Sequence, residues 1–138
     1  GPLALRGFNT NAVGVVRVTE AALPLLRRSN SPVVVTVSSS AGSFWAVTNP
    51  GRPEYHLTNA VYAASKAAAT MLTVQYAKAN PGMRLNAIAP GYTATDMTAA
   101  FDGGQPVEEA ARAVVKLATI GSDGPTGTLQ DAEGVMNW

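Results

Sequence analysis

Two side chains that can move a proton stand four residues apart in an alanine-rich segment. Tyr62 and Lys66 lie in residues 61–79, an uninterrupted stretch whose composition predicts a helix. Side chains at positions i and i+4 share one face of a helix, so the phenol and the ammonium would be neighbours. A nearby ammonium stabilises the phenolate form of a tyrosine, whose ordinary pKa is about 10. The pair is therefore suited to proton transfer at a carbonyl or alcohol oxygen.

Three serines that follow a predicted strand supply further polar groups. Residues 33–37 are five consecutive β-branched residues, a pattern typical of a strand buried on both faces of a parallel sheet. Ser38, Ser39 and Ser40 come next, at the carboxyl end of this strand, where α/β sheets place their ligand crevice. A crossover helix begins near the same end of the sheet, so the tyrosine and the lysine would lie beside these serines. One hydroxyl could then hold a substrate oxygen, and the helix N-terminus adds a positive dipole.

Helices and strands alternate along the rest of the chain. The expected elements are a helix over 11–28 that bends or breaks at Pro24, a strand over 33–37, a loop over 38–60, a helix over 61–79, a strand over 83–89, a loop over 92–105, a helix over 106–120 and a strand over 126–130. This alternation implies right-handed βαβ units and an α/β fold with a parallel sheet. Residues 1–6 are left outside these elements, as a cleavage scar or the point where a longer protein was cut.

Composition excludes several classes of protein. The 138 residues are 46% hydrophobic and 14% charged, with a net charge of +1 and no basic stripe, which argues against nucleic-acid binding. The chain has no cysteine and one histidine, His56, so neither disulfides nor cysteine- or histidine-rich metal sites are expected. No apolar run approaches the roughly 18 residues of a membrane span, and the first residues lack the pattern of a signal peptide. We expect a cytoplasmic protein without a metal, a membrane or a nucleic-acid partner.

The proton-transfer pair lies in a segment that resembles a family signature. It is similar to the YxxxK motif of short-chain dehydrogenases/reductases, with YAASK at residues 62–66. Three other segments resemble the same family: the strand with the catalytic serine (VTVSSSAG, 35–42), the helix with the structural and proton-relay asparagine (NAVG, 11–14) and a strand ending in Pro-Gly (RLNAIAPG, 84–91). The segments stand in the family's order, and the resemblance covers nearly the whole chain, from Phe8 to Trp138.

The resemblance implies reversible hydride transfer between a nicotinamide cofactor, NAD or NADP, and a small-molecule carbonyl/alcohol substrate. Tyr62 would act as the general acid/base on the substrate oxygen, and Lys66 would stabilise its phenolate and hold the nicotinamide ribose. Ser39 would hydrogen-bond the substrate carbonyl, with the serine on either side in that role if the alignment slips by one. Asn11 would hold a water that links Lys66 to solvent. Tyr62 and Lys66 would share the cofactor site with the residues that line its nicotinamide end: Pro90, Gly91, Thr93 and Thr95.

One departure from the family concerns its first βαβ unit, whose Gly-rich turn cradles the pyrophosphate and has no counterpart in this sequence. Residues 1–138 are therefore expected to form a partial NAD(P)-binding Rossmann domain, the second half of a doubly wound parallel sheet. The strand over 33–37 would then have a bare edge. The first half lies elsewhere in a longer protein, or a second copy covers the edge, or a short protein has abandoned the cofactor. The alternative functions are a cofactor-free isomerase or dehydratase and an inactive assembly partner.

A second departure is the stretch between Ser39 and Tyr62, which is longer than the family usually has. This insertion would cover the substrate pocket, where Trp45 would either contact the substrate or pack the loop down. His56 is interpreted as a surface residue of the loop. The predicted helices over 11–28 and 61–79 resemble the pair that forms the family's dimer, so we expect a homo-oligomer, with Trp138 at a subunit interface.

Overall fold

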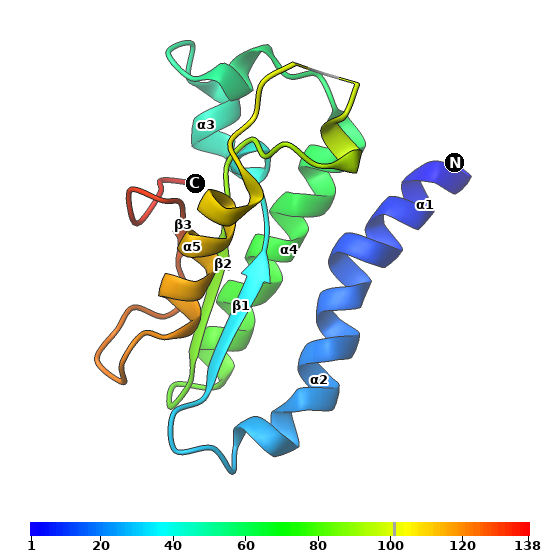
Figure 1. Cartoon of the computed structure of the whole chain (residues 1–138). Coiled ribbons are helices and arrows are strands. Elements are labelled where there is room, and N and C mark those ends of the chain that lie inside the picture. Colours follow the sequence, from blue (N-terminus) through cyan, green and yellow to red (C-terminus); the bar gives the residue numbers. More distant parts are fainter. Residues whose placement is uncertain (101) are drawn as a thin grey trace.

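The protein is built on a three-stranded parallel sheet. The computed structural model describes residues 1–100 and 102–138. The strands are β1 (Val33–Val37), β2 (Arg84–Ile88) and β3 (Leu129–Gln130), in the order β1-β2-β3 (Figure 1). β1 and β2 pair from Val33 with Arg84 to Val37 with Ile88, so both strands end at the same edge of the sheet. The predicted α/β fold with a parallel sheet is confirmed.

Helices cover both faces of this sheet. α4 (Ala60–Ala79) lies behind the sheet in Figure 1, and α5 (Val107–Ala118) lies in front of it. Thr73 of α4 donates a 2.8 Å hydrogen bond to the hydroxyl of Thr36 on β1. The apolar cluster on this side contains Leu23, Ala77, Met83 and Leu85. The predicted helices over 61–79 and 106–120 are thus confirmed to within two residues at each end.

The first helix begins earlier than predicted. α1 (Pro2–Phe8), a π-helical turn (Asn9–Val13) and α2 (Gly14–Leu26) form one continuous helical run, where we expected a helix over 11–28 and no element over residues 1–6. Proline suits the first helical position, because the N–H that it lacks would be unpaired there in any case. The helix passes Pro24 unbroken and ends two residues later; the proline removes only its own hydrogen bond to the turn before it.

The segment over 38–60, expected to be a loop, contains short helices. These are a 3₁₀ turn (Ser40–Gly42), α3 (Phe44–Thr48) and a second 3₁₀ turn (Pro53–His56). Helices of three to five residues are too short to show a sustained hydrophobic period, which is why the sequence pattern did not predict them. The predicted loop over 92–105 includes residue 101, which lies outside the described residues, and contains a further 3₁₀ turn (Asp96–Thr98).

The strands differ in how deeply they are buried. Leu85 and Ile88 of β2 are each 1% exposed, whereas residues 33–35 of β1 are half-buried and Val37 is 52% exposed. The prediction that this strand is buried on both faces is therefore wrong for this chain. The physical reason is its place at the edge of the sheet, with no strand on its outer side in the part of the chain that the structure describes.

Candidate active site

The predicted tyrosine–lysine pair stands at the first turns of α4. Asn59 caps the helix, and its Oδ1 accepts a 3.3 Å hydrogen bond from the backbone amide of Tyr62. Lys66 lies one turn further on, with Nζ 5.8 Å from the centroid of the Tyr62 ring. Both side chains are half-buried, and the helix N-terminus adds a partial positive charge nearby. The phenol and the ammonium are neighbours, as their spacing predicts.

The ammonium of Lys66 is anchored to the sheet. Its Nζ donates a 3.0 Å hydrogen bond to the carbonyl oxygen of Val37, the last residue of β1. Burial lowers the pKa of Lys66 below its ordinary value, because a partly buried ammonium loses hydration. A lysine ammonium has three donors, so the bond to Val37 leaves capacity for a phenolate oxygen or for the hydroxyl groups of a ligand.

The outer two of the three serines after β1 differ in what they contact. Ser38 is 3% exposed; its Oγ donates a 3.0 Å hydrogen bond to the carbonyl oxygen of Lys66 and lies 2.7 Å from Thr70 Oγ1. These contacts make Ser38 part of the scaffold around the candidate site. Ser40 is half-buried and begins the 3₁₀ turn.

Ser39, the serine between them, has a different arrangement. Its Oγ accepts a 3.2 Å hydrogen bond from the Ala41 amide, which leaves the hydroxyl proton to be donated to another oxygen. Gly42 closes the same turn directly against α4: a Cβ on Gly42 would lie 2.6 Å from the Ala67 nitrogen and 2.7 Å from the Lys66 carbonyl carbon. The sequence analysis did not assign a role to Gly42, although its place three residues after Ser39 was visible in the quoted segment.

Asn11 reaches α4 from the π-helical turn. Its Nδ2 donates a 2.9 Å hydrogen bond to Ser65 Oγ, and Ser65 Oγ donates a 2.8 Å bond to the carbonyl oxygen of Tyr62. Ser65 is fully buried. A π-helical turn inside a helix is frequently found at a functional site. The sequence analysis missed Ser65, which lies inside the YAASK segment, and the water expected beside Asn11 stays a prediction.

The four residues predicted to line the cofactor site lie in the loop after β2. Gly91 has φ +88°, a backbone conformation that favours glycine. Thr93 Oγ1 donates a 3.1 Å hydrogen bond to the carbonyl oxygen of Gly91. Gln105, which the sequence analysis did not select, donates from Nε2 to the carbonyl oxygen of Pro90 and so closes the loop.

Thr95 begins the 3₁₀ turn of this loop. Its backbone amide donates a 2.9 Å hydrogen bond to Thr98 Oγ1, and that hydroxyl donates a 2.6 Å bond to the carbonyl oxygen of Thr93. The loop therefore has a defined shape set by threonine side chains. Because β1 and β2 end at the same edge, this loop and the serine turn leave the sheet side by side.

The insertion between Ser39 and Tyr62 carries the aromatic residues singled out in the sequence. Trp45 is 37% exposed, and the guanidinium carbon of Arg52 lies 5.4 Å from the centroid of its ring. His56 is exposed, as interpreted, and its ring stands edge-on to that of Tyr55 at a centroid distance of 5.2 Å. A contact between Trp45 and a substrate stays a prediction.

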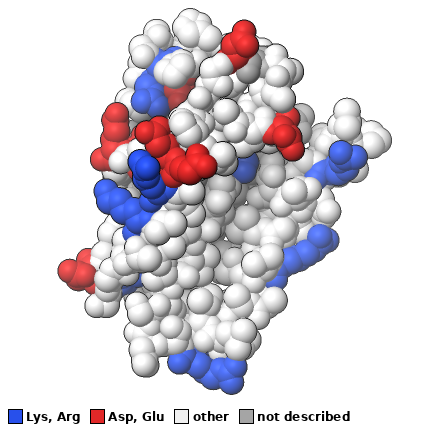
Figure 2. Space-filling view, viewed as in Figure 1, with Lys and Arg blue, Asp and Glu red and all other residues white. Residues whose placement is uncertain are grey.

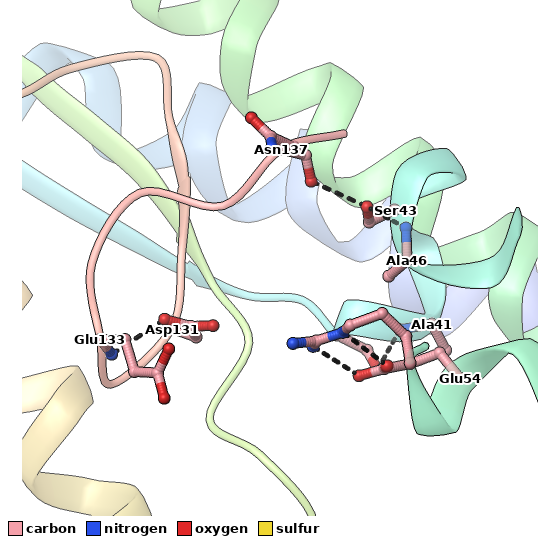
Figure 3. Close-up of polar contacts among 9 residues, drawn as sticks. Ala41, Ser43, Ala46, Glu54, Asp131, Glu133 and Asn137 are labelled. Atoms are coloured by element: carbon pink, nitrogen blue, oxygen red, sulfur yellow. Dashed lines mark hydrogen bonds and ion pairs between the residues drawn. The ribbon is translucent and has the colours of Figure 1, made fainter. Parts of the chain in front are cut away.

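The C-terminal segment is tied to the start of the insertion (Figure 3). Ser43 is fully buried; its Oγ donates a 2.8 Å hydrogen bond to the carbonyl oxygen of Asn137 and accepts a 3.1 Å bond from the amide of Ala46. The sequence analysis missed Ser43, although a serine just before a helix is a common N-cap. Trp138, the next residue, is 51% exposed, and its place at a subunit interface stays a prediction.

Figure 2 shows acidic and basic side chains close together in the upper part of one face, whereas only basic side chains are seen along its right side and at the bottom. The described residues contain no group of three or more acidic or histidine side chains placed to hold a metal ion. Within residues 1–100 and 102–138, no helix is long and apolar enough to cross a membrane.

Several known proteins are similar to this chain in sequence and in fold. (−)-Isopiperitenone reductase of Mentha piperita is 36% identical over 86% of this chain and 48% of its own length, and (+)-neomenthol dehydrogenase of Capsicum annuum is 32% identical over 87% and 48%. The crystal structure of NADPH-bound carbonyl reductase from chicken fatty liver matches with a TM-score of 0.80 at 26% identity, over 95% of this chain and 55% of its own. Salutaridine reductase of Papaver somniferum matches with a TM-score of 0.77 at 30% identity, over 93% and 54%.

These matches also show how much of each relative the chain covers. The chain spans about half the length of the curated relatives it matches. The family model that matches is that of the short chain dehydrogenases, over residues 5–105. It includes the π-helical turn, the serine turn, the tyrosine–lysine pair and the loop after β2. The chain belongs to the short-chain dehydrogenase family.

Proposed function

We propose that this chain is the catalytic half of an NAD(P)-dependent oxidoreductase that acts on a small-molecule carbonyl/alcohol pair. The observation that carries the proposal is the Tyr62–Lys66 pair at the start of α4, with Lys66 bonded to the end of β1 and the serine turn alongside. Membership of the short-chain dehydrogenase family and the reductases and dehydrogenases among its relatives support it. When bound, the nicotinamide ring supplies or accepts the hydride.

The side chains of this half handle the proton and the substrate oxygen. Tyr62 donates a proton to that oxygen during reduction and takes it back during oxidation. Lys66, one helical turn along, favours the phenolate through its positive charge. Ser39 donates its hydroxyl proton to the same oxygen and orients it. Asn11 fixes the first turns of α4 through Ser65 and holds a water that links Lys66 to solvent.

The residues at the carboxyl edge of the sheet fit a nicotinamide nucleotide. Lys66 presents a half-buried ammonium, a suitable donor for ribose hydroxyls. Parallel sheets bind ligands outside the carboxyl ends of their strands, which is where the loop after β2 lies. The proposed nicotinamide end of the site therefore contains Tyr62, Lys66, Pro90, Gly91, Thr93 and Thr95. The pyrophosphate-binding turn belongs to the first half of the family's domain, which we place along the bare edge of β1.

Tyr62→Phe and Tyr76→Phe, made in the natural protein at full length, test the proposal. Tyr76 lies on the same helix, fourteen residues or about 21 Å further along, and its hydroxyl donates a 2.7 Å hydrogen bond to Glu20. Carbonyl reduction should fall about 10²–10⁴-fold in Tyr62→Phe, the range for loss of an acid/base group, and stay near the wild-type rate in Tyr76→Phe.

Fluorescence titration with NADH and with NADPH, together with the intact mass of the protein, completes this test. Both tyrosine variants should bind the nicotinamide cofactor, since neither loses the fold. Turnover that survives in Tyr62→Phe would refute the role of that tyrosine. A wild-type protein that binds neither nucleotide would refute the oxidoreductase itself.

The proposed assembly is a homo-oligomer formed through α2 and α4. Val18 and Leu25 of α2 are 71% and 62% exposed, and Val61 and Met71 of α4 are 42% and 58% exposed. Exposed apolar side chains gathered on two helices that contact each other provide a surface for a second copy. Light scattering of the natural protein should give a molar mass that is a multiple of one chain; a monomer at every concentration would contradict the assembly.

A further inference from the structure

One buried hydroxyl beside the candidate site has no part in the chemistry proposed above. The side chain of Ser38 is 3% exposed and contacts α4, whereas its backbone amide faces β2 and donates a 2.7 Å hydrogen bond to the carbonyl oxygen of Ile88. The sequence analysis left open that this serine, rather than the next one, holds the substrate oxygen. Its hydrogen bonds decide between the two roles.

The single proton of the Ser38 hydroxyl is already in use. The hydroxyl donates a 3.0 Å hydrogen bond to the backbone carbonyl oxygen of Lys66. It therefore accepts the 2.7 Å bond that joins it to Thr70 Oγ1, and Thr70 is the donor. Thr70 is 5% exposed, so this pair of hydroxyls is shielded from solvent. Ser38 has no proton left for a substrate oxygen, and its contacts instead fix the backbone of Lys66.

The end of β1 holds Lys66 at two points. The carbonyl oxygen of Val37 accepts a 3.0 Å hydrogen bond from Lys66 Nζ, and the next residue, Ser38, donates to the Lys66 backbone carbonyl. Gly42 packs on the same peptide group: an added Cβ would lie 2.7 Å from the Lys66 carbonyl carbon and 2.6 Å from the Ala67 nitrogen. The backbone of the lysine is thus fixed relative to the strand whose end carries the serines.

The two hydrogen bonds to Lys66 lie on different sides of β1. Backbone groups of successive residues in a strand point to opposite edges. The Pro32 carbonyl and the Ser38 amide bond to β2, so the Val37 carbonyl faces the outer edge, along which we place the first half of the domain. A strand paired there would have amide groups of its own for the Val37 carbonyl. The Ser38 hydroxyl is directed at α4, so it can hold Lys66 whether or not that edge is covered.

We propose that Ser38 is a positioning residue that fixes the backbone of Lys66 and so places its ammonium beside Tyr62 and the ribose of the cofactor. The inference rests on the proposed function, because it uses the two tasks that Lys66 has there. Ser38 itself touches neither the substrate nor the cofactor. A shift of the Lys66 backbone moves the ammonium, and misplacing a group by about 1 Å in an active site costs roughly 10²-fold in rate.

Ser38→Ala in the natural protein at full length tests the proposal, with 4-nitrobenzaldehyde as the carbonyl probe and fluorescence titration with NADH and NADPH. We expect kcat to fall roughly 10- to 100-fold. The Kd of the nucleotide should rise about 2- to 10-fold, the range for one weakened hydrogen bond. The KM of the probe should change little. Values of kcat and Kd near those of the wild type would overturn the proposal, and so would a raised KM with an unchanged kcat, which would make Ser38 the serine that binds the substrate.

Thr73→Val is the matched control, because it removes another buried hydroxyl between α4 and β1. Thr73 is 2% exposed, and its Oγ1 donates a 2.8 Å hydrogen bond to Thr36 Oγ1. It lies seven residues, or about 10 Å, further along α4 than Lys66. Both variants should lower the melting temperature, but only Ser38→Ala should change kcat and Kd. Equal losses of kcat in the two variants would trace the effect to a loosened α4 and overturn the positioning of Lys66.

A double-mutant cycle with Lys66→Met shows whether Ser38 acts through the lysine. The cycle uses the Kd of NADH and NADPH, which needs no turnover. Ser38→Ala should leave this Kd unaltered in the Lys66→Met background, because the ammonium that Ser38 places is absent there. The same rise in Kd in both backgrounds would overturn the proposal.

Thr70→Val decides the question if Ser38→Ala does not fold. It keeps the Ser38 hydroxyl and removes the group that donates to it, so kcat should fall about 2- to 10-fold, the range for one lost hydrogen bond. A kcat equal to that of Thr73→Val would overturn the proposal in that case. A wild-type protein that binds neither nucleotide overturns the proposed function and this inference with it. A wild-type protein that reduces the probe, with Ser38→Ala equally active, overturns this inference alone.

Discussion

Gly42→Ala is the sharpest test of how the serine turn is seated. The added Cβ would lie 2.6 Å from the Ala67 nitrogen and 2.7 Å from the Lys66 carbonyl carbon, both backbone atoms of α4 that cannot rotate away. The turn and the helix would have to separate by about 0.8 Å to reach the 3.4 Å at which ordinary contacts begin. Overpacking of this kind costs about 1–3 kcal/mol, and a displacement near 1 Å at a reacting group costs roughly 10²-fold in rate.

Thermal unfolding and kcat, measured on the same preparations, check this estimate. Both are measured on the natural protein at full length, where about 2–4 °C per kcal/mol applies, so the melting temperature should fall by roughly 2–12 °C. Gly14→Ala is the matched control, because Gly14 is helical and its added Cβ would have its nearest neighbour at 3.6 Å. That variant should gain about 0.5–1 kcal/mol from helix propensity. A Gly42→Ala protein with wild-type stability and wild-type kcat would refute the close-approach argument.

The remaining predictions concern Lys66 and the apolar face of α2. The pKa of Lys66 is lower in the folded chain, so the unfolded chain binds more protons just below the ordinary lysine pKa of about 10.4, and stability should rise with pH there. Urea unfolding across that pH window should show that the free energy of unfolding rises less with pH in Lys66→Met than in the wild type. The same dependence of this free energy on pH in both proteins would contradict the burial of the ammonium. Val18→Glu should lower the molar mass seen by light scattering, while Val115→Glu, a change at a 58% exposed position on α5, should leave the molar mass unchanged.

The parts of the fold that follow from local pattern could be predicted from the sequence. The alanine-rich stretch gives α4 to within one residue of its start, because helix propensity acts through neighbouring turns. The place of Tyr62 and Lys66 beside the serines follows from the direction of a parallel crossover. The short helices within 38–60 could not be predicted, because each is fixed by one cap or one proline rather than by a repeating pattern.

The partners of the site residues could not be predicted, because they are distant in the sequence. Asn11 and Ser65 are 54 residues apart, and Ser43 and Asn137 are 94 residues apart. The local sequence around each residue does not indicate such distant pairings. The burial of β1 was overestimated for a related reason: five β-branched residues indicate a strand, but how deeply a strand is buried depends on the strands beside it.

The anchors of the candidate site all lie within this half of the domain. Lys66 is held by Val37 of β1, Ser65 is held by Asn11, and the serine turn rests on α4 through Gly42. The Lys66 contact lies at the outer edge of β1, because Pro32 and Ser38 bond to β2 and the Val37 carbonyl faces the other way. The groups proposed to move the proton are therefore positioned by contacts internal to the chain.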